Sequence, residues 1–295
     1  HNTSIYFNGI GTSKSGLFSN LAFNKGIFTW AVKLSFIKAG EQKLLEEEEV
    51  EKGLLDPESN VCFGEGGAGL FSDGKLITRI KSPYIQYVLE RLVDFGAPPE
   101  ITYVNNPHVG SDKLRKVIRR MVQYLRDSGC ELHYETRVEG LRLGPDRRVE
   151  GLELRDGRVI EGSRVLLATG HSARDVYQML NDRQVALEAK SFAIGLRIEH
   201  PQALINRLQL GEAVAPELGA AQYRLTYHQD DTSVYSFCMC PGGYVLSAGT
   251  EADGVVSNGM SNYHRNSKWA NSALVVPIDA ASLPGEDLSL YTSDA

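Results

Sequence analysis

The sequence lacks the features that would place this chain in a membrane or in a disulfide-rich secreted class. It holds four cysteines in 295 residues, too few and too scattered for a disulfide framework, so we expect a reducing compartment and a cytoplasmic location. The most apolar stretch, residues 17–39, is interrupted by Lys25, Lys33 and Lys38. It therefore falls short of the roughly 18 to 20 uninterrupted apolar residues of a membrane span. No compact basic start with a small-residue cleavage site marks a signal peptide.

A surplus of positive charge is also missing. The formal net charge is -6, which argues against a protein whose main partner is nucleic acid. Charged residues make up 23% of the chain and hydrophobic residues 42%, a mixture typical of a globular enzyme. Cys238 and Cys240 stand two positions apart with no second ligand pair nearby, so we predict no metal site. A redox-active thiol and a purely structural role both stay open for this pair.

Glycine is abundant in one place, residues 60–80, which read NVCFGEGGAGLFSDGKLITRI. Five glycines fall in this segment: Gly64, Gly66, Gly67, Gly69 and Gly74. Glycine is tolerated where the backbone needs positive φ or must approach another group closely. Successive N–H groups in such a turn can bind an anion, and Ser72, Asp73 and Lys75 add a hydroxyl, an acceptor and a cation. The segment therefore predicts a site for a phosphate, a ribose or a flavin edge, with an ordinary surface loop as the alternative.

Hydrophobic periodicity organises the middle of the chain. Apolar residues recur at helical spacing over 82–96 and 111–129, and Ser82 and Ser111 are expected to cap these helices. The second helix also carries a basic face, which indicates a solvated surface or a phosphate site. Short strands are expected at 131–134, 138–143, 149–154 and 158–160. A buried strand at 164–168 then runs into an ATG turn, followed by a helix over 173–180 capped by Ser172.

The last third of the chain has a strand-like pattern. Apolar or alternating segments at 191–199, 222–227, 234–239 and 244–248 predict a mainly antiparallel sheet, with a short helix at 201–208. A loop at 262–268 offers His264, Arg265 and Lys268 to an anionic substrate, or is an ordinary polar loop. His108 and His171 are candidate proton donors, although a histidine beside a turn is more often a hydrogen-bonding cap.

Several separated motifs resemble one family. The segments PESNVCFGEGGAGLFSDGKLITRI, LLATGHSARD, FCMCPGGYVLSAGTEADGVVSNGMS and WANSALVV occur in order between residues 56 and 278. Together they are similar to a family of FAD-dependent dehydrogenase-like flavoproteins of the two-dinucleotide-binding-domain type. The resemblance implies an α/β fold, in which a Rossmann-like FAD-binding domain with a β-meander is joined to a mainly antiparallel α+β substrate domain. It divides the chain into a divergent N-terminal segment (1–59), a partial FAD-binding domain (60–188), an inserted substrate domain (189–279) and a polar tail (280–295).

The same resemblance implies a function and a set of site residues. It predicts an FAD-dependent oxidoreductase that transfers hydride or electrons between the flavin and an unknown small-molecule substrate, with NAD(P)H as a candidate electron donor. The residues expected along the cofactor are Gly66, Gly67, Ala68, Gly69, Ser72, Asp73 and Lys75 in the glycine-rich segment, Arg137 and Val138 against the adenine, and Ala168, Thr169 and Gly170 in the ATG turn. No general acid or base is singled out.

Two family segments are not found in this sequence. A flavoprotein of this type begins with a strand and GxGPAG, whose helix N-terminus binds the pyrophosphate, and it closes with a GD or GE motif beside the flavin. Residues 1–59 supply no GxGPAG, since the glycines at 9–16 have another spacing, and residues 280–295 read as a polar tail and not as the closing segment of the family. We therefore expect a chain that is truncated or divergent at both ends. A truncated chain without redox activity, or a module that only binds nucleotides, is the alternative function.

Overall fold

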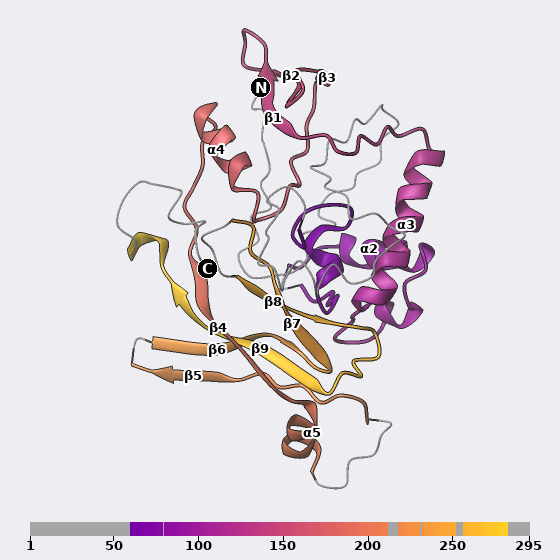
Figure 1. The fold of residues 1–295 in the computed structure, drawn as a ribbon, viewed down its shortest axis with the longest axis vertical. Coiled ribbons are helices and arrows are strands. Elements are labelled where there is room, and N and C mark those ends of the chain that lie inside the picture. Colours follow the sequence, from indigo (N-terminus) through magenta and orange to yellow (C-terminus); the bar gives the residue numbers. More distant parts are fainter. Residues whose placement is uncertain (1–59, 79, 212–217, 231, 252–255, 283–295) are drawn as a thin grey trace.

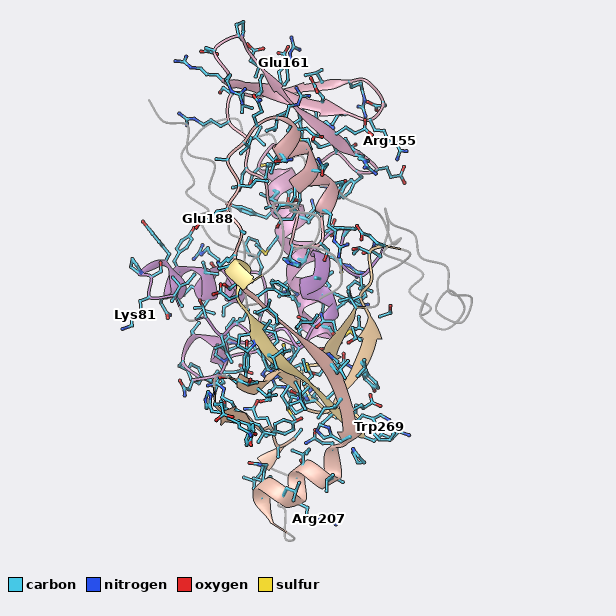
Figure 2. All side chains as sticks on the ribbon, turned by 90° about the vertical axis from the view of Figure 1, so that its left-hand side faces the viewer. Lys81, Arg155, Glu161, Glu188, Arg207 and Trp269 are labelled. Carbon is cyan, nitrogen blue, oxygen red and sulfur yellow. The ribbon has the colours of Figure 1, made fainter. Side chains whose placement is uncertain are left out.

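The computed structural model describes residues 60–78, 80–211, 218–230, 232–251 and 256–282. Figure 1 shows three regions: a helical region that contains the glycine-rich segment, a small three-stranded sheet with one helix beside it, and a larger antiparallel region. Viewed from the side, the small sheet with Arg155 and Glu161 lies at one end and the helix carrying Arg207 lies at the other (Figure 2). The expectations for residues 1–59 and most of the tail at 280–295 fall outside the described residues.

The helical region forms because two amphipathic helices bury their apolar faces against each other. Its elements are the 3-10 helix η1 (Gly67–Phe71), α2 (Tyr84–Asp94), the 3-10 helix η2 (Pro99–Thr102) and α3 (Ser111–Asp127). The core contains Leu92, Ile101 and Val117, each no more than 1% exposed. These contacts confirm the periodicity that predicted both helices.

The helix starts differ slightly from expectation. Pro83, and not the expected Ser82, occupies the cap position of α2, although Ser82 Oγ accepts a hydrogen bond from the Tyr84 N–H at 3.2 Å. The expected cap Ser111 is instead the first residue of α3, and Gly110 occupies the cap position with φ of 77°. The Ser111 hydroxyl donates to Asn262 Oδ1 at 3.1 Å, because it faces another part of the protein and not its own helix end.

The small sheet is an antiparallel meander of β1 (Val138–Leu143), β2 (Val149–Leu154) and β3 (Val159–Glu161). These strands confirm three of the predicted segments. Helix α4 (Arg174–Asp182) packs on the sheet, where Leu141, Leu152 and Leu180 form a shared core. Its cap position is Ala173, and not Ser172 as predicted.

Two predicted strands are not formed. Residues 131–134 contain only one isolated bridge residue, and residues 164–168 pair with no strand of the described chain. Val165 and Leu167 pack on the core beneath α4, whereas Leu166 is 49% exposed. Alternate side chains of this segment are therefore buried. Packing of Val165 and Leu167 holds the segment against the core, although its backbone pairs with no described strand. Within the described residues every strand pair is antiparallel, so the Rossmann-like sheet stays a prediction.

The larger region contains a four-stranded sheet and a two-stranded ribbon. The sheet has the order β4-β9-β6-β5, formed by β4 (Phe192–Pro201), β9 (Trp269–Ile278), β6 (Thr232–Cys240) and β5 (Thr226–Gln229). The ribbon pairs β7 (Gly243–Ser247) with β8 (Ser257–Ser261), and α5 (Gln202–Leu210) follows β4. The structure confirms the predicted antiparallel sheet and the short helix. The segment expected at 222–227 becomes a strand only from Thr226 onward.

Among the helices within the described ranges, none has both the length and the apolar composition that a membrane span requires.

Candidate functional site

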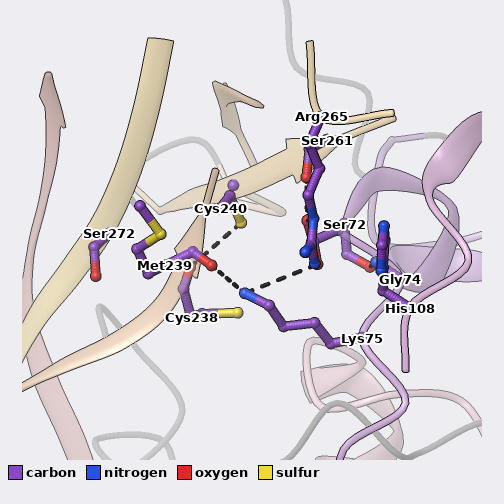
Figure 3. Close-up of polar contacts among 12 residues, drawn as sticks. Ser72, Gly74, Lys75, His108, Cys238, Met239, Cys240, Ser261, Arg265 and Ser272 are labelled. Carbon is purple, nitrogen blue, oxygen red and sulfur yellow. Dashed lines mark hydrogen bonds and ion pairs between the residues drawn. The ribbon is translucent and has the colours of Figure 1, made fainter. Parts of the chain in front are cut away.

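The glycine-rich segment is fixed to the antiparallel region by Asp73, whose side chain is fully buried. Its Oδ1 accepts a hydrogen bond from Arg265 Nε at 3.0 Å, and its Oδ2 accepts one from Arg265 Nη2 at 2.5 Å. Ser261 Oγ donates to Oδ1, and Lys75 Nζ lies 3.8 Å from Oδ2. Figure 3 shows Ser261 and Arg265 reaching this site from one side and Lys75 from the other.

The surroundings of Asp73 decide its charge. Burial raises the pKa of the Asp73 carboxyl, but the hydrogen bonds from Arg265 and Ser261 and the charges of Lys75 and Arg265 together lower it. Asp73 is therefore ionised in the folded protein at neutral pH. A buried carboxylate is stable only when it is paired and hydrogen-bonded in this way.

Lys75 extends the contact to β6. Its Nζ donates to the backbone carbonyl of Met239, in a segment where the pairing of β6 with β9 shifts register between Phe237 and Cys240 (Figure 3). Cys238 has φ of 52° there, so the strand bulges. Both thiols are free of a disulfide.

Three glycines of this junction are required by internal packing. A Cβ on Gly74 would come within 2.8 Å of Gly110 N. A Cβ on Gly110 would overlap the backbone of Tyr263, and one on Gly242 would overlap the carbonyl of Arg265. Their φ angles are also positive, at 67°, 77° and 50°. The glycines thus allow three backbone segments to meet closely.

The remaining glycine-rich residues form a compact turn. The Ser72 hydroxyl donates to the carbonyl of Gly69 at 2.9 Å and accepts a hydrogen bond from the Gly74 N–H at 3.1 Å. Gly66 has φ of 87°, and a Cβ there would meet the Leu70 side chain. Gly67 differs, because its φ of 51° is combined with room for a Cβ, whose nearest neighbour, Cys62 O, is 3.5 Å away.

Three of the segments predicted to line the cofactor meet at one core. Phe63, just before the glycines, packs in the same cluster as Ala173 at the start of α4, directly after the ATG turn. Val138, the first residue of β1, packs against this cluster. Its neighbour Arg137 forms an ion pair with Asp175 of α4, with Nη2 and Oδ2 3.2 Å apart. The fold therefore brings together residues that are about 100 positions apart in sequence.

The ATG turn lies at an open surface. Thr169 is half-buried, while Ala168 and Gly170 are exposed. Gly170 has φ of 86°, and a Cβ built on it would have no atom within 4 Å. No internal contact of the described residues therefore explains the small side chains of this turn, in contrast to the glycines around Asp73.

The candidate proton donors differ in position. His108 Nε2 is hydrogen-bonded to the backbone carbonyl of Tyr263 at 3.0 Å, and Lys75 pairs with His108 in an isolated β-bridge. Burial and the charge of Arg265 lower the pKa of His108, while its bond to Tyr263 acts in the opposite direction. Burial and the charge of Arg174 lower the pKa of His171. Both imidazoles are therefore neutral at neutral pH, and His108 has a positioning contact within the protein.

The loop at 262–268 has a role that the sequence did not reveal. Arg265 was predicted to meet an anionic substrate, and the anion it binds is the protein's own Asp73. Ser261 also belongs to this buried polar junction, and Arg197 and Asn271 lie next to it; none of the three was predicted. Ser261 and Asn271 fall in the quoted motifs that contain NGMS and WANSALVV, whereas Arg197 falls in none of them. Within the part of the chain that the structure describes, no three His, Cys, Asp or Glu side chains form a metal-binding group.

The residues present fit a flavin cofactor in part. Gly170 combines positive φ with open space, and Gly67 combines positive φ with room for a Cβ, which suits close approach by a bound group. Asp73, Lys75 and Ser72 are engaged inside the protein and hold the segment in shape. Their direct contact with a cofactor stays a prediction, as do the contacts of the other predicted residues.

Comparison with known proteins adds an independent finding. Residues 191–292 match the family model described as FAD-dependent protein, C-terminal domain-like. An uncharacterised protein of Clostridium beijerinckii is 43% identical over 283 residues, which cover 94% of this chain and 52% of that relative. The chain thus spans about half the length of the curated relative it matches. Together with the antiparallel region seen in the structure, the family match supports a FAD-dependent protein family for this chain.

Proposed function

We propose that this protein takes part in an FAD-dependent oxidoreductase reaction, in which hydride or electrons pass between the flavin and a small molecule. The observation that carries the proposal is the match of residues 191–292 to the C-terminal domain of FAD-dependent proteins. The glycine-rich segment supports it, because the Asp73–Arg265 pair fixes this segment directly to the matched domain.

The residues that would hold the cofactor are the small ones of the glycine turn and of the ATG turn. They are Gly66, Gly67, Ala68 and Gly69, together with Ala168, Thr169 and Gly170. When bound, FAD supplies the redox chemistry, and the protein supplies binding and orientation. Asp73 and Lys75 would act indirectly, because their contacts within the protein keep the glycine turn in the conformation that binds the cofactor.

A Rossmann-like FAD-binding domain is part of the same proposal. The meander of β1, β2 and β3 with α4 packed on it agrees with the expected insertion in such a domain. Residues 164–168 lead directly into the ATG turn, which is the position that the resemblance gives to a returning strand. NAD(P)H is the electron donor we would test first.

The proposal is tested by incubating the purified protein with FAD, desalting it and recording the absorbance spectrum. We expect flavin bands to remain with the protein and to bleach on anaerobic reduction. Bleaching by NADPH or NADH would identify the donor. Thermal stabilisation by ADP with no retention of FAD would contradict the proposal and favour a nucleotide-binding module.

A further inference from the structure

A second polar site lies between the four-stranded sheet and the β7–β8 ribbon. Arg197 of β4 and Asn271 of β9 are joined there by a hydrogen bond from Arg197 Nη1 to Asn271 Oδ1, at 2.8 Å. Arg197 Nη1 also reaches the carbonyl of Cys238 at 3.5 Å, on the bulge of β6. The adjacent carbonyl, that of Met239, accepts from Lys75. This site therefore adjoins the junction at Asp73.

Two donors of this site have no acceptor within the described residues. Arg197 Nε and Asn271 Nδ2 are both buried and unpartnered there, and the Asn271 side chain belongs to a residue that is 0% exposed. Leaving a buried donor unsatisfied costs about 1–3 kcal/mol, and more for a charged group. Native proteins rarely accept this cost without a ligand, an ion or water at the site.

The charges at the junction are also unbalanced. Lys75 and Arg265 flank Asp73, the buried carboxylate. No carboxylate of the described residues lies within 4.0 Å of the Arg197 guanidinium, although Glu199 is on the same strand, where it is exposed. Arg197 therefore brings a positive charge that Asp73, already bound to Arg265, does not neutralise.

Gly259 leaves the room that the Arg197 and Asn271 side chains occupy. It is buried on β8, and a Cβ there would overlap Asn271 Oδ1 and come within 2.7 Å of Arg197 Nη1 and 2.8 Å of Cys240 Sγ. Any larger residue at position 259 would displace the pair. The arrangement of Arg197 and Asn271 thus depends on a glycine contributed by a third strand.

We propose that Arg197 and Asn271 bind the carboxylate of a small-molecule ligand. Arginine binds carboxylates through two parallel N–H donors along one edge of its plane, and Nε belongs to that edge. Asn271 Nδ2 supplies a further donor to the same anion. A carboxylate has two oxygens to receive these donors, and its charge offsets that of Arg197. This site goes beyond the proposed flavin function, which does not depend on it.

The test uses the whole 295-residue chain without added flavin, so that its result is independent of FAD binding. Acetate and succinate are titrated against chloride at equal ionic strength, and inorganic phosphate is the third probe. Thermal unfolding and calorimetry report binding. We expect both carboxylates to stabilise the wild type, and their affinity to fall at least tenfold in Arg197→Gln. Arg148→Gln, which removes an arginine that is exposed in the β1–β2 turn, serves as the matched control and should leave binding unchanged.

A second variant guards against misfolding of Arg197→Gln. Asn271→Asp is close in size and supplies its own carboxylate to Arg197, so we expect a folded protein that no longer responds to acetate or succinate. Equal carboxylate affinity in the wild type and both variants would overturn the proposal. So would stabilisation by phosphate alone, which would indicate a phosphate site, or a wild type that responds to none of the three probes.

Discussion

The guanidinium of Arg265 binds both carboxylate oxygens of Asp73, a residue 192 positions earlier in the chain. This pair connects the glycine-rich segment to the loop between β8 and β9. Asp73 is fully buried between these two segments. The pair can therefore form only when the two segments pack closely. The shape of the glycine turn therefore depends on the domain that matches the FAD-dependent family.

Removing the charge of Asp73 should destabilise the fold. Asp73→Asn leaves the Arg265 guanidinium without its anion, and breaking a buried ion pair costs about 3–5 kcal/mol. Equilibrium unfolding in urea would measure this loss. Asp156→Asn is the control, because Asp156 and its partner Arg158 are exposed, and its unfolding midpoint should stay at the wild-type value. An unfolding free energy equal to wild type in Asp73→Asn would show that the pair does not hold the junction.

The close packing of the junction predicts a difference between two glycines with positive φ. Gly110 and Gly129 have φ of 77° and 83°, and Gly110 has ψ of 151°. A Cβ on Gly129 would meet nothing within 4 Å, whereas one on Gly110 would overlap Tyr263. Gly129→Ala should therefore cost only the roughly 1–2 kcal/mol of a left-handed L-residue. Gly110→Ala should cost clearly more in the same urea experiment, and equal losses would contradict the contact with Tyr263.

Stability should decrease as the pH falls below neutrality. Burial and the charge of Arg265 lower the pKa of His108 in the folded protein, while an unfolded histidine has a pKa of about 6.5. The unfolded chain then binds more protons, so the stability is fully present above about pH 6.5 and falls as the pH drops toward the folded pKa. Asp73, Lys75 and the Tyr263 carbonyl also act on this histidine.

The measurement is the unfolding free energy at a series of pH values between about 8 and 5, in wild type and in His108→Asn. The wild type should lose stability more steeply, because the variant lacks one of the groups with a lowered pKa. His171 and His200 have lowered pKa values too, so part of the slope should remain. Parallel pH profiles would show that His108 titrates normally in the folded state.

Local patterns were sufficient to predict most helices and antiparallel strands. The spacing of Leu114, Val117 and Ile118 gives α3, and the alternation in 234–239 gives most of β6, because both depend on one buried face. Residues 164–168 were expected to form a buried strand, and among the described residues they have no strand partner. An apolar run predicts that side chains are buried, but it does not predict whether the backbone forms hydrogen bonds with a neighbouring strand.

The site was harder to predict than the fold. Asp73 and Arg265 were each identified as charged groups in glycine-rich or polar loops, and each was assigned to an outside ligand. Only the tertiary structure shows that they bind each other, since no local pattern couples positions so far apart. The bulge at Cys238 and the buried pair of Arg197 and Asn271 depend in the same way on contacts between strands.

The most direct test of the central claim compares FAD retention by wild type, Gly170→Ala and Gly157→Ala. Gly170 and Gly157 have φ of 86° and 84°, and a Cβ on either would meet no protein atom within 4 Å. Both variants therefore place an alanine at positive φ without a steric clash, but only Gly170 lies in the ATG turn. After incubation with FAD and desalting, wild type and Gly157→Ala should keep their flavin absorbance, and Gly170→Ala should lose at least nine-tenths of it. Equal retention in both variants, or a wild type that stays colourless, would contradict the account.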